Sequence, residues 1–214
     1  MKKWKVIAFY TKDSVYKEVL DTHLMPTLEK LDLDYEITEV PNLHNWHKNV
    51  AQKPMFIKNA LDRCDRNVVV LDADATIERY PVLFDELEEK LVTWEKDSGY
   101  VQYDIALHYL DWATWYDRPG ITTKELLTGT MWLRNCDRVK DICQKWSDDA
   151  IKVGDWEQAA LARVLKKEHA NIYEIPLEYI YINSMPDGKA PNVKIEDPYI
   201  VHHQVSRKLK KVKL

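Results

Sequence analysis

The sequence predicts a single α/β domain in which helices flank a mostly parallel central sheet. In the first 72 residues, apolar β-branched segments alternate with amphipathic segments, an order typical of parallel strands joined by right-handed helical crossovers. The segment VVVL at 68–71 is apolar at every position, as in strands buried on both faces of a parallel sheet. Because 214 residues suit one hydrophobic core, we place no domain boundary in 1–214.

The individual elements are expected from the spacing of apolar residues, which recur every second position in strands and every three to four in helices. The segment 15–31 keeps a helical period in spite of Pro26, and Pro54 suits the first turn of the next helix. Strands are expected at 5–11, 35–40, 68–71, 104–109, 126–133 and 172–176, and helices at 15–31, 54–64, 81–94, 137–151 and 156–165.

Charge is distributed unevenly along the chain. The net charge is −4, but Arg207, Lys208, Lys210, Lys211 and Lys213 crowd the last nine residues and leave −9 on the rest. An acidic body argues against a general nucleic-acid coat protein. The basic tail fits a solvated end, a phosphate clamp or a weak contact with a polyanion.

Composition also bears on the compartment. The cysteines Cys64, Cys136 and Cys143 are odd in number and have no recognised spacing, which argues against a disulfide framework and a zinc site. No segment approaches the about 18 apolar residues of a membrane span, and the apolar run at the N-terminus is too short for a signal peptide. We therefore expect reduced thiols and a cytoplasmic protein.

The segment VVVLDADATI at 68–77 carries the sharpest functional signal. A buried strand that ends at Asp72 and Asp74 delivers two carboxylates to the carboxyl edge of the sheet, where open α/β sheets bind ligands. Two carboxylates so close repel each other, and a divalent cation such as Mn²⁺ or Mg²⁺ relieves the repulsion. The alternative interpretation is a solvated turn after a strand.

Two enzyme classes place Asp-x-Asp at such a point: the nucleotide-sugar transferases and the haloacid-dehalogenase-like phosphatases. DADAT fits the phosphatase motif, with Asp72 as nucleophile and Asp74 as acid/base. That interpretation requires its strand near the start of the fold, whereas about seventy residues precede it here. It also requires a later pair of acidic residues, and Ala159 stands where the second acidic residue of that pair is expected. The phosphatase stays as an alternative, together with a non-catalytic nucleotide- or sugar-binding domain.

Further short motifs occur in a defined order: FYTKDSVY, KPMFIKNAL, VVVLDADATIERYPVLFDEL, LLTGTMWLRN, GDWEQAAL and IVHHQVSRK. With these motifs the chain resembles, over nearly its whole length, the nucleotide-diphospho-sugar transferases of the Rossmann-like glycosyltransferase-A fold, particularly the glycogenin-like and family-8-like group. The resemblance implies a single transferase domain. In it, 1–75 would be the nucleotide-binding half that ends in Asp-x-Asp, and 76–214 the sugar and acceptor half with the basic tail.

The resemblance also implies a metal-dependent glycosyltransferase, with a UDP-sugar as the first choice of donor. The loop after the first strand would hold the base and ribose, which makes Tyr10, Thr11 and Tyr16 candidates. Lys53 would reach the diphosphate as a cation, and Asp72 would contact the donor as well as the metal. Each of these side chains could instead serve packing or lie on the surface.

The closing motif of the family, H-x-x-G-x-x-K, matches His202 and Lys208 in spacing. The resemblance makes His202 the third metal ligand beside the two aspartates and directs Lys208 to the phosphates. His203 is an adjacent alternative. Val205 stands where the family has Gly, so the phosphate contact there is left open.

Thr128, Gly129 and Thr130 match the strand of small residues that lines the sugar pocket in the family; a simple β-bulge is the alternative. Glu157 and Gln158, with Asp155 next, lie where the family places an acid or amide beside the reacting carbon; acids at a helix start are the alternative. Asp104 and His108 lie four apart on one strand and are expected to meet sugar or acceptor hydroxyls.

The sequence leaves the acceptor open between a polysaccharide, a protein side chain and a hydroxylated DNA base. Eight Trp and twelve Tyr, together with the basic tail, favour a polyanion such as DNA, because stacking and phosphate contacts act together. The net charge of the remaining chain argues the other way.

Overall fold

The central sheet of the protein has six strands. The computed structural model describes residues 3–93, 100–116, 124–184 and 191–205. The strands of the sheet are β1 (Trp4–Thr11), β2 (Tyr35–Val40), β3 (Asn67–Leu71), β7 (Ile105–Asp111), β8 (Lys124–Leu133) and β9 (Ile172–Glu174). They lie in the order β2-β1-β3-β8-β7-β9, and β8 is antiparallel to both neighbours, whereas the other strands share one direction. The mostly parallel sheet that the sequence predicts is confirmed.

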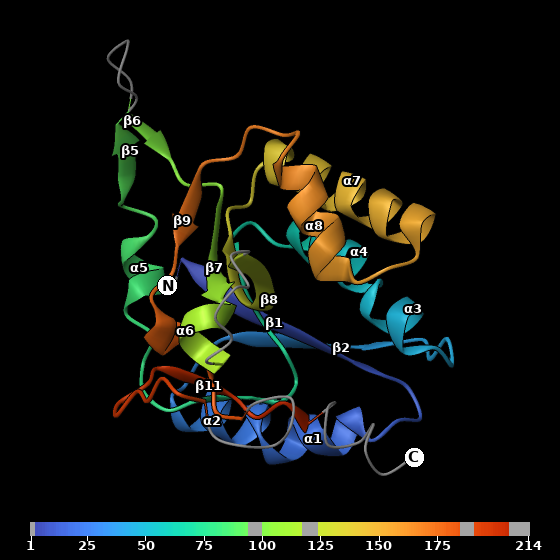
Figure 1. Cartoon of the computed structure of the whole chain (residues 1–214), viewed down its shortest axis with the longest axis vertical. Helices are drawn as coiled ribbons and strands as arrows, with labels where there is room; N and C mark the ends of the chain where they lie inside the picture. The colour runs from blue at the N-terminus through green and yellow to red at the C-terminus, as the bar shows by residue number, and fades with distance from the viewer. Residues whose placement is uncertain (1–2, 94–99, 117–123, 185–190, 206–214) are drawn as a thin grey trace.

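Helices cover both faces of this sheet. They are α1 (Tyr16–Thr22), α2 (Leu24–Lys30), α3 (Trp46–Val50), α4 (Lys53–Arg63), α5 (Leu83–Glu86), α6 (Trp112–Tyr116), α7 (Asp137–Val153) and α8 (Glu157–Leu165). Figure 1 shows α4, α7 and α8 on one side of the sheet and α1 and α2 on the other. Alternate residues of β3 explain the two cores, since Val69 and Leu71 pack in one and Val68 and Val70 in the other.

A small sheet brings the end of the chain to the carboxyl edge of β3. Its strands are β4 (Ala75–Ile77), β10 (Tyr181–Ile182) and β11 (Ile200–His202). β11 runs antiparallel to β4, with His202 opposite Ala75. Segments that are more than 120 residues apart in the sequence therefore lie side by side, and Asp74 directly precedes the strand that pairs with His202.

The prediction of one long helix at 81–94 is wrong. Only Leu83–Glu86 is helical, and Leu91–Thr93 forms β5, which pairs with β6 (Tyr100–Gln102); Trp94 lies outside the described residues. Leu83, Phe84 and Leu87 are buried in the core with Trp4. Their spacing fits a helix, but a short turn already buries them, and the β-branched end of the segment pairs as a hairpin instead.

The helix expected at 15–31 is interrupted. α1 ends at Thr22, and α2 begins at Leu24 after a backbone change at His23 (φ −111°, ψ −72°). The cause is Pro26, which has no N–H to donate to the carbonyl of Thr22 and lies instead in the first turn of α2. Within the described residues, no helix combines the length and the apolar character needed to cross a membrane.

Candidate active site

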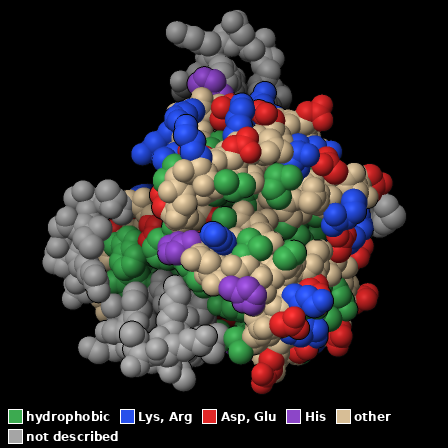
Figure 2. Space-filling view, turned by 90° about the vertical axis from the view of Figure 1, so that its right-hand side faces the viewer, with side chains coloured by type: hydrophobic (Ala, Val, Ile, Leu, Met, Phe, Trp, Pro, Cys, Tyr) green, Lys and Arg blue, Asp and Glu red, His purple; other side chains and the backbone are tan. Residues whose placement is uncertain are grey.

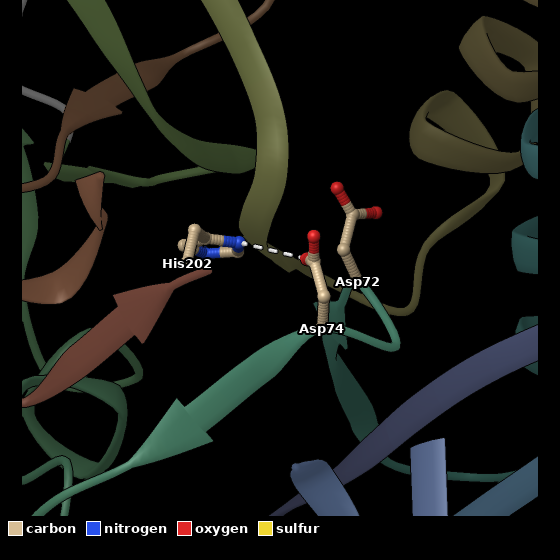
Figure 3. A group of neighbouring side chains, drawn as sticks. All are labelled: Asp72, Asp74 and His202. Atoms are coloured by element: carbon tan, nitrogen blue, oxygen red, sulfur yellow. Dashed lines mark ion pairs between the residues drawn. The ribbon is translucent and has the colours of Figure 1, made fainter. Parts of the chain in front are cut away.

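Two aspartates and a histidine meet at the carboxyl edge of β3. Ligand atoms of Asp72, Asp74 and His202 all lie within 4.8 Å of one another (Figure 3). Asp72 directly follows β3, and its N–H donates to the carbonyl of Gly129 on β8 over 3.0 Å. Two ligands of one Mg²⁺ or Mn²⁺ ion lie at most about 4.2 Å apart, so movements of less than about 1 Å would complete the site.

Asp74 is oriented by the backbone around it. Its Oδ2 accepts the N–H of Val205 at 2.9 Å, and its carbonyl oxygen accepts the N–H of His203 at 3.2 Å. The remaining Oδ1 lies 3.9 Å from Nδ1 of His202. One carboxylate oxygen is thus left to face the imidazole and a cation.

His202 is buried and held through its other nitrogen. Its Nε2 lies 2.8 Å from Oγ1 of Thr130, and burial lowers the pKa of the imidazole below its ordinary value. A neutral imidazole that donates from Nε2 to Thr130 presents the Nδ1 lone pair toward Asp74, as a metal ligand must. His203 instead contacts Thr76 and Asn183, at 3.0 and 2.9 Å. The structure therefore groups His202, and not His203, with the aspartates.

Gly129 is needed here because of space. A Cβ at this position would lie 2.9 Å from Cε1 of His202 and 3.2 Å from Oδ2 of Asp72. The register between β7 and β8 shifts between Ala106 and His108, so the segment around Gly129 bulges. The bulge that the sequence left as an alternative is present, and it lies at the candidate metal site.

We expect Gly129→Ala to weaken Mn²⁺ binding by at least about tenfold and to cost about 1–3 kcal/mol of folding free energy, because buried His202 must shift to accept the methyl group. Isothermal titration with Mn²⁺ measures the first effect. The control is Gly154→Ala, where φ is +71° and no atom lies within 4 Å of the new Cβ. That substitution strains the backbone by about 1 kcal/mol but leaves Mn²⁺ affinity alone. Unchanged affinity in Gly129→Ala would contradict the site.

Lys53 links the aspartates to a second, buried carboxylate. Its Nζ lies 2.7 Å from Oδ1 of Asp72 and 3.8 Å from Oε1 of Glu157, and the Lys53 side chain is 5% exposed. Burial by itself would lower the pKa of Lys53, but the charges of Asp72 and Glu157 raise it above its ordinary value. The lysine therefore keeps its proton and offsets the negative charge of both carboxylates.

Glu157 begins α8 and is buried beside Thr128. Burial raises the pKa of Glu157 above its usual range, although the charge of Lys53 opposes this. Oγ1 of Thr128 lies 3.0 Å from Oε1 of Glu157 and 3.3 Å from Oε1 of Gln158. The second oxygen of Glu157, Oε2, is buried and has no hydrogen-bond partner among the described residues. An orphaned carboxylate oxygen is costly unless a ligand supplies a donor.

A cavity of about 420 Å³ joins these groups, which is within the usual range for ligand sites. Tyr10, Thr11 and Tyr16 line it on the side of β1, and Lys53 and Gln158 line it on the other. Burial raises the pKa of Tyr16, and the charge of Asp74 adds to this. The structure thus brings five of the ten predicted nucleotide- and sugar-binding residues to one cavity, together with Asp74, Glu157 and Gln158.

Other predicted residues lie elsewhere. The carboxylate of Asp104 contacts Arg138 at 3.2 Å and the N–H of Asn171 at 3.0 Å. Asp104 precedes Ile105, which aligns through β8 with Val68 at the amino end of β3, far from Asp72. Nδ1 of His108 lies 2.9 Å from the carbonyl oxygen of Ile175, and His108 does not line the cavity. The structure therefore leaves Asp104 just before β7 and holds His108 at the carbonyl of Ile175, and it brings neither side chain to the cavity at Asp72.

Asp155 is engaged in a structural pair. Both of its oxygens accept from Arg163, at 2.7 and 2.8 Å, and it lines a neighbouring cavity and not the one at Asp72. The structure therefore does not bring Asp155 into the cavity that Glu157 and Gln158 line. Lys208, predicted to contact the phosphates, lies outside the described residues.

Sequence reasoning missed several polar and aromatic residues of the cavity, among them Glu125, Trp46 and Trp156. Glu125 accepts from Nε2 of Gln158 at 3.0 Å and from the indole of Trp112 at 2.6 Å. Alternation along β8, counted back from Gly129 through Leu127, could have indicated Glu125. Trp46 and Trp156 also line the cavity, and no periodic signal marked them.

No protein-family model matches the sequence, and no curated protein matches it. Solved structures do share its fold. A glycosyltransferase involved in the glycosylation of the major capsid of PBCV-1 is similar with a TM-score of 0.65 and 12% identity, over 98% of each chain. Mouse xyloside xylosyltransferase 1 is similar with a TM-score of 0.55 and 9% identity, over 95% of this chain and 98% of its own.

The glycosyltransferase GlyE of Streptococcus pneumoniae is similar with a TM-score of 0.56 and 14% identity, over 94% of this chain and 55% of its own. At such identities the likeness is one of fold. The chain therefore has the fold of these glycosyltransferases, and the fold that its sequence motifs predict is confirmed.

Proposed function

We propose that the protein is a metal-dependent glycosyltransferase that uses a nucleotide-diphosphate sugar, with a UDP-sugar as the first choice. One observation carries the proposal: Asp72, Asp74 and His202 converge at the carboxyl edge of the sheet, beside a cavity with an orphaned buried carboxylate. Two carboxylates and an imidazole suit Mn²⁺ or Mg²⁺, and Gly129 provides the space. Similar solved structures that are glycosyltransferases favour transfer over the haloacid-dehalogenase-like alternative.

In the proposed reaction, the bond between the anomeric carbon and the diphosphate breaks, and an acceptor hydroxyl oxygen bonds to that carbon. The nucleoside diphosphate departs, and the hydroxyl proton passes to its released oxygen. When bound, the metal ion neutralises the negative charge that develops on the diphosphate. Lys53 holds Asp72 in place through the 2.7 Å contact and adds a positive charge near the diphosphate.

The sugar would lie against the start of α8. Glu157 lines the cavity, and its buried Oε2, which has no partner among the described residues, would accept a hydrogen bond from a sugar hydroxyl once the carboxylate rotates toward the cavity. Thr128 carries a single hydroxyl hydrogen, so donating it to Glu157 leaves Oε1 of Gln158 free to face the anomeric carbon. Glu125 holds the amide of Gln158 in this orientation through the 3.0 Å contact. The positive charge that develops on the sugar would be stabilised by Oε2 of Glu157 and Oε1 of Gln158.

The experiment that tests the proposal is thermal unfolding with a panel of nucleoside diphosphates, with and without Mn²⁺. A ligand at about a hundred times its dissociation constant stabilises the native state by about 2.7 kcal/mol. We expect a raised midpoint that requires both the metal and a nucleotide, largest with UDP. No shift with any nucleotide, together with release of phosphate from simple phosphoesters, would support the phosphatase. A shift without hydrolysis of any nucleotide-sugar would point to a non-catalytic binding domain.

A further inference from the structure

A second cavity, of about 650 Å³, lies beside the donor cavity. The end of β2, helices α3 and α4 and the last turns of α7 form its walls. Its lining is largely apolar, with Val40, Leu43, Met55, Phe56 and Ile151 among the contributing side chains. A volume in this range suits a small molecule or one chain of a larger one, and not a protein surface.

The two cavities share a wall. Residues of α3 alternate between them, since Trp46 lines the donor cavity and His47 and Lys48 line the larger one. At the start of α8, Asp155 lines the larger cavity and Trp156 the donor cavity. The rings of Trp46 and Trp156 meet edge to face, 5.9 Å apart. The aromatic pair therefore lies in the wall between the two cavities.

Exposed apolar side chains gather at the mouth of the larger cavity. Figure 2 faces this side of the molecule and shows hydrophobic side chains near its centre, with His and basic side chains among them. Leu43 and Ile151 are 46% and 72% exposed and line the cavity. Val153 and Trp156, 52% and 44% exposed, directly flank its lining residues 154 and 155. Apolar side chains left in water around a cavity mark a binding surface.

The charged side chains that line the larger cavity indicate which kind of molecule it binds. Arg63 is paired with Glu36, and Asp155 is paired with Arg163. Lys48 is exposed and has no carboxylate within ion-pair distance among the residues described. A molecule that matches this lining therefore has an apolar body and one anionic group that lies beside α3. A bare oligosaccharide would leave the apolar lining unmatched, and a nucleic acid would bring more charge than one lysine neutralises.

We infer that this cavity binds the acceptor, and that the acceptor is an amphiphile in which a hydrocarbon chain is joined through a phosphate to a hydroxyl-bearing head group. The chain would lie against Leu43 and Ile151, and the phosphate against Lys48. The head group would then pass Trp46 and Trp156 to present its hydroxyl to the donor. The inference rests on the proposed function for the acceptor role and on the second cavity for the binding.

The test is a fluorescence titration of the whole protein with octyl phosphate, octyl glucoside and inorganic phosphate, below micelle-forming concentrations. Octyl phosphate is expected to bind at least tenfold more tightly than either of the others. Lys48→Ala should remove the preference for octyl phosphate over octyl glucoside, and Ile151→Glu should weaken both by at least tenfold. The controls are Lys166→Ala and Val82→Glu, an exposed lysine and an exposed apolar residue away from the cavity, and neither should change binding.

The same samples are heated with UDP and Mn²⁺ to separate the two proposals. A nucleotide-dependent rise without binding of octyl phosphate would reject the amphiphile acceptor and leave the donor proposal standing. Binding of octyl phosphate without any nucleotide effect would reject the acceptor role of the cavity together with the donor proposal. Equal loss in the control variants would show that the probe binds non-specifically, which also overturns the inference.

Discussion

Asp72→Asn and Asp74→Asn are each expected to remove hydrolysis of the nucleotide-sugar donor by on the order of 100- to 1000-fold, while the protein stays folded. Asparagine keeps the size of the side chain and removes its charge, so the cation loses half of the carboxylate charge that holds it. Lys53 keeps Glu157 as a partner in Asp72→Asn, so no buried charge is left alone. Release of nucleoside diphosphate from the donor, followed over a Mn²⁺ titration, measures the effect.

The control for these two variants is Asp62→Asn. Asp62 is an aspartate of α4 whose carboxylate pairs with Lys58 and Lys140 at the surface, and it does not line the donor cavity. Its hydrolysis rate should equal that of the wild type. Near-normal rates in both Asp72→Asn and Asp74→Asn would refute the metal site. Loss in all three variants would indicate a general effect of charge.

Lys53→Met is expected to lower the free energy of unfolding by about 3 kcal/mol. Removing one member of a buried charge pair costs about 3–5 kcal/mol because the other charge is left uncompensated. Glu157 is 6% exposed and would lose its cation, whereas Asp72 is 40% exposed and can turn to water. Because water partly reaches Asp72, we expect the loss of unfolding free energy to lie at the lower end of this range. Urea denaturation monitored by Trp fluorescence measures it.

Two companion variants separate charge from packing. Lys58→Met removes an i,i+4 pair with Asp62 on the same helix, and this should cost less than about 1 kcal/mol because that pair is solvent-exposed. Glu157→Gln added to Lys53→Met should recover part of the lost stability, because it removes the uncompensated buried charge. A loss of similar size in Lys53→Met and Lys58→Met would contradict the buried network.

The local sequence was enough to predict an element where a single hydrophobic pattern dominates the segment. The unbroken apolar run of β3 has no other plausible environment than a buried strand, and it places Asp72 and Asp74 at the carboxyl edge. The same reasoning failed at 81–94, where the apolar spacing fits a helix but only Leu83–Glu86 is helical. Pairing between β5 and β6, which lies outside the reach of any local pattern, decides that segment.

Residue roles depended more strongly on tertiary contacts. The motif match selected His202, but only the pairing of β11 with β4 brings it to Asp74, across more than 120 residues. Lys53 was expected at a phosphate, and the fold places its Nζ against Asp72 and Glu157, two charges that no sequence pattern links. Asp104 was expected at the ligand site, but the fold places it at the other end of the sheet. Its position on a strand predicts the face of the sheet on which the side chain lies, but not the end of the sheet.

The sequence by itself therefore determined the strands of the central sheet, the alternation of strands and helices in the first 72 residues, and the pair of carboxylates at the edge of β3, because each depends on neighbours within a few residues. Only the tertiary structure decided which histidine joins them, which cation offsets their charge, and that a second apolar cavity adjoins the donor site. Those outcomes depend on long-range strand pairing and on packing between α3, α4, α7 and α8, whose free energy is not contained in any single segment of the chain.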